Sequence, residues 1–165
     1  MAIHLCLEEI SVLEIEAADT AIIASILSRP QLMRLNSGLH NRDFLKLILD
    51  RGLMTSDRLF ACQENGNGYY LGLILIESRM ILGEQTTVLS FAFDRCVAGR
   101  ARAIEGIAAL RQAIDLNGSV CLIGPSMANS ERAAKALGYL PANEFVLDNI
   151  PYKVLRLMER RLSSS

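Results

Sequence analysis

The sequence VLSFAF at residues 88–93, followed by AGRARA at residues 98–103, decides how the second half of the chain folds. The first run is apolar and typical of a buried strand, and the second opens a long helical pattern. Small residues between a strand and a helix leave backbone N–H groups exposed, and helix N-termini attract anions. Arg100 and Arg102 add positive charge. The turn therefore predicts a site for a ligand that carries a pyrophosphate, although alanine and arginine are also simply good helix formers.

The elements after this turn predict a crossover unit. The helix is expected to run to about Leu116, and the short apolar run at residues 120–123 is typical of a buried parallel strand. A short helix is expected to start near Asn129 and to end at Gly138. Two further strands are expected to pair with each other at the C-terminal end, over residues 145–147 and 152–158.

The first half of the chain predicts strands, two helices and a hairpin. Asp19 is a candidate cap for the first helix, which Pro30 ends, and a second helix is expected from about Asn41 to Arg51. The run at residues 71–76 is apolar on both faces and predicts a central strand that is covered on both sides. The expected strands span residues 3–7, 12–15, 59–63, 69–77 and 86–93.

Composition predicts one globular domain over residues 1–162, with a disordered tail at residues 163–165. Of 165 residues, 51% are hydrophobic and 21% are charged, and the net charge of −1 predicts neither nucleic-acid nor membrane binding. The N-terminus lacks the pattern of a signal peptide. The longest apolar run, residues 69–76, is shorter than the ~20 residues of a membrane-spanning helix. We therefore expect a cytoplasmic protein.

The cysteines and histidines do not predict a metal site or a hydrolase triad. The cysteines are widely spaced, form no CxxC pair and lie at positions 6, 62, 96 and 121. Three of them are expected to be buried thiols. Cys96 lies between Arg95 and Arg100 and could be an activated thiol nucleophile, but no histidine base accompanies it. His4 and His40 are expected to be surface or cap residues.

The order of elements resembles the GCN5-related N-acetyltransferase (GNAT) superfamily. In that family the fourth strand ends in a Q/R-x-x-G-x-G/A turn that binds the pyrophosphate of acetyl-CoA, and the fifth strand splays away to leave a slot for pantetheine. Residues 16–19 resemble the family's first strand-to-helix junction, and residues 129–139 resemble its fifth-strand-to-fourth-helix segment. The resemblance covers roughly the whole chain. It implies an α/β (α+β) fold with a mixed, mostly antiparallel sheet of six to seven strands, a parallel and splayed fourth and fifth strand, and about four helices.

The resemblance also implies a co-substrate, acetyl-CoA or another acyl-CoA, and no metal. Ala98 stands where the family has Gln or Arg, and Ala101 stands at a glycine position, where its methyl group would crowd a pyrophosphate. The side chains of Arg100 and Arg102 can replace part of that contact by charge pairing. The implied cofactor-binding residues are Phe91, Ala92, Phe93, Ala98, Gly99, Arg100, Ala101, Arg102, Ala103 and Asn129.

The catalytic residues that the resemblance implies are a base that projects from the middle strands toward the slot and an acid four residues before the glycine that ends the fourth helix. Ser90 and Glu77 are the polar candidates for the base, and Glu77 is also interpreted as a solvated strand end. Ala134 stands where many family members have a tyrosine that protonates the leaving thiolate. Tyr139 is expected in the core. Water or one of three nearby side chains would then supply the proton, namely Ser126, Asn129 or Ser130.

Three functions stay open at this point. The first is acyl transfer from acyl-CoA to a primary amine by direct attack in a ternary complex. The second is a non-catalytic GNAT-like module that binds CoA or a protein, and the third is an acyltransferase that uses an acyl carrier protein.

The acceptor is expected to be a small-molecule or peptide amine. Residues 32–39 and 79–85 would form loops on its side, and their lack of an acidic patch disfavours aminoglycosides and polyamines. An apolar final strand at residues 154–157 could pair across a homodimer.

Overall fold

The computed structural model describes residues 2–16, 19–29, 32, 34–38, 43–44, 46, 57–95 and 97–158. The strands are β1 (His4–Cys6), β2 (Ile10–Ile15), β3 (Arg58–Glu64), β4 (Tyr70–Ile81), β5 (Glu84–Phe93), β6 (Val120–Ile123), β7 (Tyr139–Leu147) and β8 (Ile150–Leu157). The helices are α1 (Thr20–Leu27), α3 (Val97–Ala113) and α4 (Ala128–Ala136). The expected second helix and the tail fall mostly or wholly outside these residues, although Phe44 is helical and buried.

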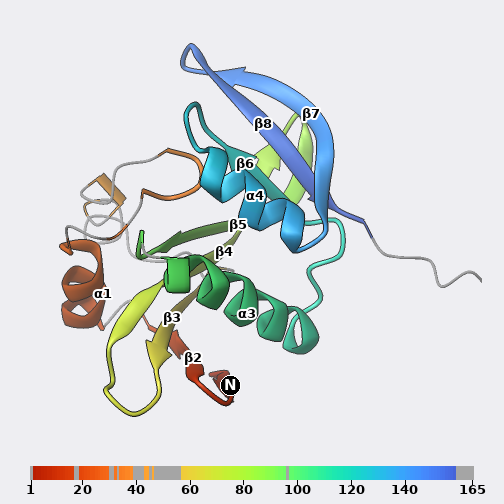
Figure 1. Ribbon diagram of the computed structural model, residues 1–165. Coiled ribbons are helices and arrows are strands. Elements are labelled where there is room, and N and C mark those ends of the chain that lie inside the picture. The colour runs from red at the N-terminus through yellow and green to blue at the C-terminus, as the bar shows by residue number, and fades with distance from the viewer. Residues whose placement is uncertain are drawn as a thin grey trace, which may run out of the picture.

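One sheet in the order β1-β2-β3-β4-β5-β6-β8-β7 organises the described part of the chain (Figure 1). Neighbouring strands are antiparallel except β5 and β6, which are parallel and are connected by α3. This confirms the expected mixed sheet and the crossover unit. Its eight strands exceed the six to seven that the resemblance implies, but they match the eight strand segments expected along the sequence, the short edge strand β1 among them.

Helices cover both faces of the sheet (Figure 1). Helices α3 and α4 pack on one face through residues such as Ile107, Leu110 and Ala133. These residues share a core with apolar side chains from the strands of the sheet, to which β7 contributes only its first residue, Tyr139. On the other face α1 contributes Ile23 and Ile26 to a second core. Because β4 side chains alternate between these two cores, the strand is buried from Leu71 to Ile76, as its apolar pattern predicts.

Three local expectations need correction. Residues 79–85 do not form a loop, because β4 and β5 continue to a two-residue turn in which Leu82 and Gly83 both have positive φ. The final strand β8 is not an edge: it lies between β6 and β7, and Leu155 is buried there. Cys6 is exposed rather than buried, since β1 is an edge strand.

The N-terminal cap of α1 differs from the expectation, whereas the end of α4 agrees with it. Asp19 occupies the N-cap position of α1, but its carboxylate accepts a hydrogen bond from Glu16 N (3.2 Å) instead of capping the helix. Gly138 follows α4 with φ +100°, as the sequence predicts for a helix end. None of the described helices is long and apolar enough to span a bilayer.

Candidate functional site

The strands β5 and β6 meet at a single register pair and then separate. Val88 pairs with Val120, and no further pair joins the two strands toward their C-terminal ends, in contrast to the ten register pairs between β4 and β5. This opening, which we call the slot, lies where the resemblance places pantetheine. The splayed parallel pair is therefore present at the expected place in the sequence.

Asn36 lies inside the slot and connects its two sides. It is fully buried, and its Oδ1 accepts a hydrogen bond from Phe91 N (2.9 Å). Its Nδ2 donates to Leu122 O (3.0 Å) and, at longer range, to Leu89 O (3.4 Å). Two backbone bonds complete the contact, from Asn36 N to Phe91 O (3.2 Å) and from Gly124 N to Asn36 O (3.0 Å). The side chain thus bonds to both β5 and β6.

The backbone groups that face the slot come from alternate residues of β5. Leu89 and Phe91 present theirs to Asn36, so Phe93 follows on the same side by the alternation of a strand. Asp94 N instead donates to Leu71 O (3.0 Å) of β4. The backbone groups of Ala92 therefore fall on the β4 side, and among the expected pantetheine contacts Phe91 and Phe93 are the ones whose groups face the slot.

Residues 98–103 lie within α3 and not in a turn before it. The helix begins at Val97, so the N–H groups of its first four residues lack acceptors within the helix. No acidic residue stands in this first turn. Ala103 is buried in the core, whereas Ala101 is exposed. The N-terminus of α3 can receive an anion, and Ala103 can contribute to a site only indirectly.

Arg102 is engaged by carboxylates within the protein. It pairs with Glu9 of the β1–β2 turn and with Glu105 one turn further along α3 (2.8 Å). This arginine fastens α3 to the N-terminal hairpin. The side chain of Arg100 and the whole of Cys96 lie outside the described part of the structure, so their predicted roles stay predictions.

The two base candidates face the same side of the sheet. Ser90 pairs with Leu75, and Glu77 pairs with Val88, so the two polar side chains are diagonal neighbours on the α1 face. Ser90 is buried and lies between Leu89 and Phe91, the residues whose backbone Asn36 contacts. Burial raises the pKa of Glu77 above its ordinary value of 4.5, although the nearby Arg79 opposes the shift.

An open pocket of about 900 Å³ lies next to the slot. Ser37 and Gly38, next to Asn36, form part of its wall, and Asn129 of α4 and Tyr152 of β8 line it as well. Two arginines and one aspartate also line it, namely Arg34, Arg95 and Asp43. Neither Ser90 nor Glu77 is among the residues that line it.

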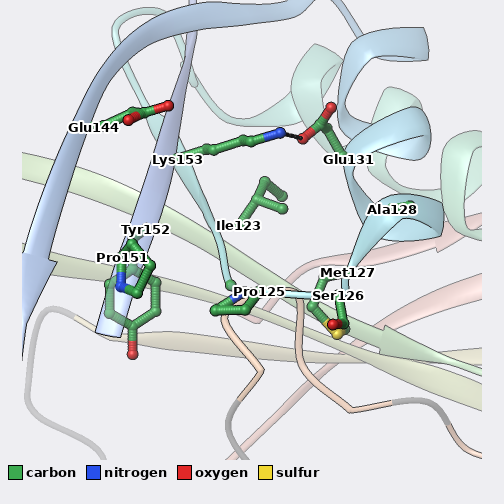
Figure 2. Close-up of a pocket in the computed structure, with 11 residues that line it drawn as sticks. Ile123, Pro125, Ser126, Met127, Ala128, Glu131, Glu144, Pro151, Tyr152 and Lys153 are labelled. Atoms are coloured by element: carbon green, nitrogen blue, oxygen red, sulfur yellow. Dashed lines mark hydrogen bonds and ion pairs between the residues drawn. The ribbon is translucent and has the colours of Figure 1, made fainter. Parts of the chain in front are cut away.

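A smaller pocket of about 310 Å³ lies between α4 and the β7–β8 hairpin. Figure 2 shows the Lys153 ammonium of β8 reaching the Glu131 carboxylate of α4 across it (3.0 Å). Ser126, a candidate proton donor with positive φ, lines both pockets. Ser130 is buried in α4, so of the three candidate donors Ser126 and Asn129 are the exposed ones.

The position of the family's general acid is closed to solvent. Ala134 belongs to α4 and is fully buried in the core. Tyr139 is also buried, and its hydroxyl lies 2.7 Å from Ser119 Oγ. Burial raises the pKa of Tyr139 well above its ordinary value. This confirms that Tyr139 is a core residue.

One cluster at the mouth of the slot was not predicted from the sequence. Arg29, just after α1, makes an ion pair with Asp94 at the end of β5, in which its Nη2 donates to both carboxylate oxygens (2.9 and 3.2 Å). Its guanidinium lies over the ring of Tyr69 (3.8 Å to the centroid), and the Tyr69 hydroxyl donates to Asp94 (3.0 Å). The cluster fixes the end of α1 to the end of β5, and Leu32 forms a bridge with Asp94 beside it.

The residues capable of metal binding are not clustered. Among the described residues no group of three or more histidine, cysteine, aspartate or glutamate side chains could hold a metal ion. His4 is exposed on β1, and His40 lies outside the described residues. Burial raises the pKa of the Cys62 and Cys121 thiols, as befits core residues.

Solved structures of GNAT acetyltransferases share this architecture. A GNAT-family acetyltransferase from Bacillus anthracis superposes with a TM-score of 0.65 at 16% identity, covering 96% of this chain and 100% of the other. The ribosomal-protein-S5-alanine acetyltransferase from Vibrio fischeri gives 0.67 at 12% identity, with coverages of 96% and 97%. A spermidine N-acetyltransferase chimera from Vibrio cholerae and hSSAT gives 0.63 at 10% identity, with coverages of 92% and 96%. No family model and no curated protein sequence matches the chain.

These similarities establish the fold. The chain has the GNAT fold over nearly its whole length, which confirms the resemblance stated from the sequence. At 10–16% identity the activities of those proteins cannot be assigned to this chain. What this chain does has to be argued from its own site.

Proposed function

We propose that this protein transfers an acetyl or other acyl group from acyl-CoA to a primary amine, by direct attack in a ternary complex. The observation that carries the proposal is the splayed β5–β6 pair with a bare helix N-terminus beyond it. A thioester with a long amide-containing arm and a pyrophosphate matches both features, because the slot offers amide partners and the helix end favours phosphate.

The N-terminus of α3 suits this co-substrate, whereas the slot is filled by Asn36. The N–H groups of residues 97–100 and the charge of Arg100 suit the pyrophosphate. Phe91 N–H and Leu89 C=O face the slot and suit an amide or an acyl oxygen, but Asn36 now occupies them. Since the occupant is itself an amide, the chemistry of the slot agrees with the arm of CoA once Asn36 has left.

The chain's own groups would act on the acceptor from the α1 face. Glu77, through water and Ser90, would take the proton of the attacking amine, and its raised pKa brings it closer to the range of a useful base. Phe91 N–H would stabilise charge on the acyl oxygen. Bound acyl-CoA supplies the thioester whose C–S bond breaks as the C–N bond forms. Water or Ser126 would protonate the departing sulfur.

The test is acetyl-CoA and desulfo-CoA binding by calorimetry to wild-type protein and to Arg100→Ala. Arg111→Ala, which removes the same charge from the last turn of the same helix, is the matched control. We expect wild-type binding that weakens roughly tenfold in Arg100→Ala, which equals about 1.4 kcal/mol, and that is retained in Arg111→Ala. Equal weakening in both variants would refute a pyrophosphate site at this helix end.

A second function is favoured by one observation, the fully buried Asn36 in the slot. A chain that permanently fills its slot, and that has Ala134 in place of a phenol, would be a non-catalytic binding module. Absence of acyl-CoA binding in wild-type protein and in a variant freed of Asn36 would favour that function over acyl transfer.

A further inference from the structure

We propose that Asn36–Gly38 is a latch that closes the slot in the free protein and leaves it when an acyl donor binds. The inference rests on the proposed function, because it names the event that must precede binding there. Three features of the described residues support it: the chemistry of the contact, the space beside it and the absence of apolar anchoring in the latch itself.

The latch presents the same hydrogen-bonding groups to the slot as the ligand that it excludes. The carboxamide of Asn36 accepts from Phe91 N and donates to Leu122 O, so it offers one acceptor and one donor to the two sides of the slot. A secondary amide of the CoA arm offers the same pair of groups. Exchange of one amide for another leaves Phe91 N satisfied in both states, which makes a swap far less costly than exposure of an unpaired group.

Space for the open position lies directly behind the latch. Ser37 and Gly38 line the pocket of about 900 Å³, while the neighbouring Asn36 fills the slot. Gly38 has φ +87°, and a Cβ at this position would meet no atom within 4 Å. Movement of Asn36 away from β5 therefore has a free volume to enter.

Hydrogen bonds, and not an apolar contact, hold the latch in place. Leu35, just before it, is buried in the α1-side core and fixes the base of the segment. From Asn36 onward the partners are backbone groups of β5 and β6, Gly124 just after β6, and Leu35 O, which accepts a hydrogen bond from Gly38 N (2.7 Å). Such bonds can be replaced by a ligand or by water, whereas a buried apolar plug would resist removal.

The experiment uses full-length protein and acetyl-CoA as the probe. Asn36→Ala removes the three side-chain bonds, and we expect it to bind acetyl-CoA about tenfold more tightly by calorimetry, because less of the protein is held closed. Asn65→Ala is the matched control: Asn65 also makes three side-chain bonds, to Ser11, Leu7 and Glu8, but it lies in the β3–β4 turn. Its acetyl-CoA affinity is expected to stay at the wild-type value.

Hydrogen exchange of the wild-type protein tests the same inference without a variant. Saturating acetyl-CoA should speed exchange of the Asn36 and Gly124 amides, which lose their partners, and keep the Phe91 amide protected. Unchanged exchange at Gly124 with ligand bound, or Asn36→Ala affinity no tighter than wild type, would overturn the latch.

The two proposals fail in different ways. If wild type binds acetyl-CoA and Asn36→Ala binds it no more tightly, the latch fails and the proposed function stands. If neither protein binds acetyl-CoA, the proposed function fails, and the latch is judged by exchange in the free protein. If the Asn36 and Gly124 amides then exchange only at the rate of global unfolding, the slot is permanently filled by Asn36 and the latch proposal is overturned.

Discussion

The carbonyl of Ser37 lies directly against Gly124. A Cβ on Gly124 would stand 2.2 Å from Ser37 O and 2.8 Å from Ser37 C. Gly124 also donates its N–H to Asn36 O (3.0 Å), so the latch and the end of β6 are in backbone contact. Because a real Cβ does not approach this closely, the absence of a side chain at position 124 is what allows the latch to lie in the slot.

Gly124→Ala is therefore expected to push the latch out of the slot. We expect a loss of roughly 1–3 kcal/mol in the free energy of unfolding, the usual effect of overpacking, together with tighter acetyl-CoA binding. Urea denaturation and calorimetry measure the two effects. Gly106→Ala is the control, because its Cβ would make ordinary contacts of 3.5 Å with Cys62 and Val12. Wild-type stability and affinity in Gly124→Ala would contradict the packing argument.

Glu77→Gln is expected to stabilise the protein more at pH 7 than at pH 4. Burial raises the pKa of Glu77 above 4.5 in the folded state, so folding binds a proton in the window between the ordinary and the raised pKa. The wild type therefore loses the contribution of Glu77 to stability as pH rises through that window, whereas the variant does not. Urea denaturation at both pH values measures the difference.

Glu14→Gln is the control, because it is expected to change the stability at pH 7 in the opposite direction. The Arg58 guanidinium donates to both oxygens of Glu14 (2.9 and 2.8 Å) and lowers the pKa of that carboxyl. The stability from this pair is present at neutral pH and is lost as pH falls through the lowered pKa. Glu14→Gln should therefore destabilise at pH 7 and have less effect in acid. Glu77→Gln and Glu14→Gln changing stability in the same direction at pH 7 would refute the assignment.

Asp94→Asn is expected to destabilise the protein by about 3 kcal/mol, because it leaves the mostly buried Arg29 without its carboxylate. Denaturation in urea gives the value. Tyr69→Phe is the matched control: it keeps the ring beneath Arg29 and removes only the hydroxyl bond to Asp94, so about 1 kcal/mol should be lost. Similar losses in the two variants would show that the ion pair contributes little to the cluster.

The fold was predictable because strand and helix patterns are local. The apolar run at residues 71–76 has no polar face, so it had to be covered on both sides, and it is. The pattern of residues 97–113 likewise marked a helix between two parallel strands. The position of the sheet edge was less predictable. The apolar strand β8 lies inside the sheet because β7 pairs with its outer side and forms the edge, and the sequence of β8 alone does not encode this order.

The candidate site was only partly predictable, because it depends on contacts between distant segments. The resemblance implied a splayed strand pair with contacts from residues 91–93. The strands β5 and β6 do separate beyond the Val88–Val120 pair, whereas the contacts stay a prediction. The run Asn36-Ser37-Gly38 carries turn residues and signals a turn, but nothing in it shows that the asparagine enters a slot 55 residues away in sequence. The sequence suggested that Arg102 binds phosphate. Its pairing with Glu9 was not predicted, because the two residues are 93 positions apart in the sequence.

Tyr139→Phe is expected to leave acyl transfer and its pH profile unchanged, because the Tyr139 hydroxyl is buried against Ser119 and does not line either pocket. It should cost about 1–3 kcal/mol of stability, since Ser119 Oγ loses its partner. Adding Ser119→Ala should recover part of that loss by removing the unpaired group. Steady-state kinetics and urea denaturation measure both effects. A loss of about 100-fold or more in kcat with stability retained would instead identify Tyr139 as the general acid.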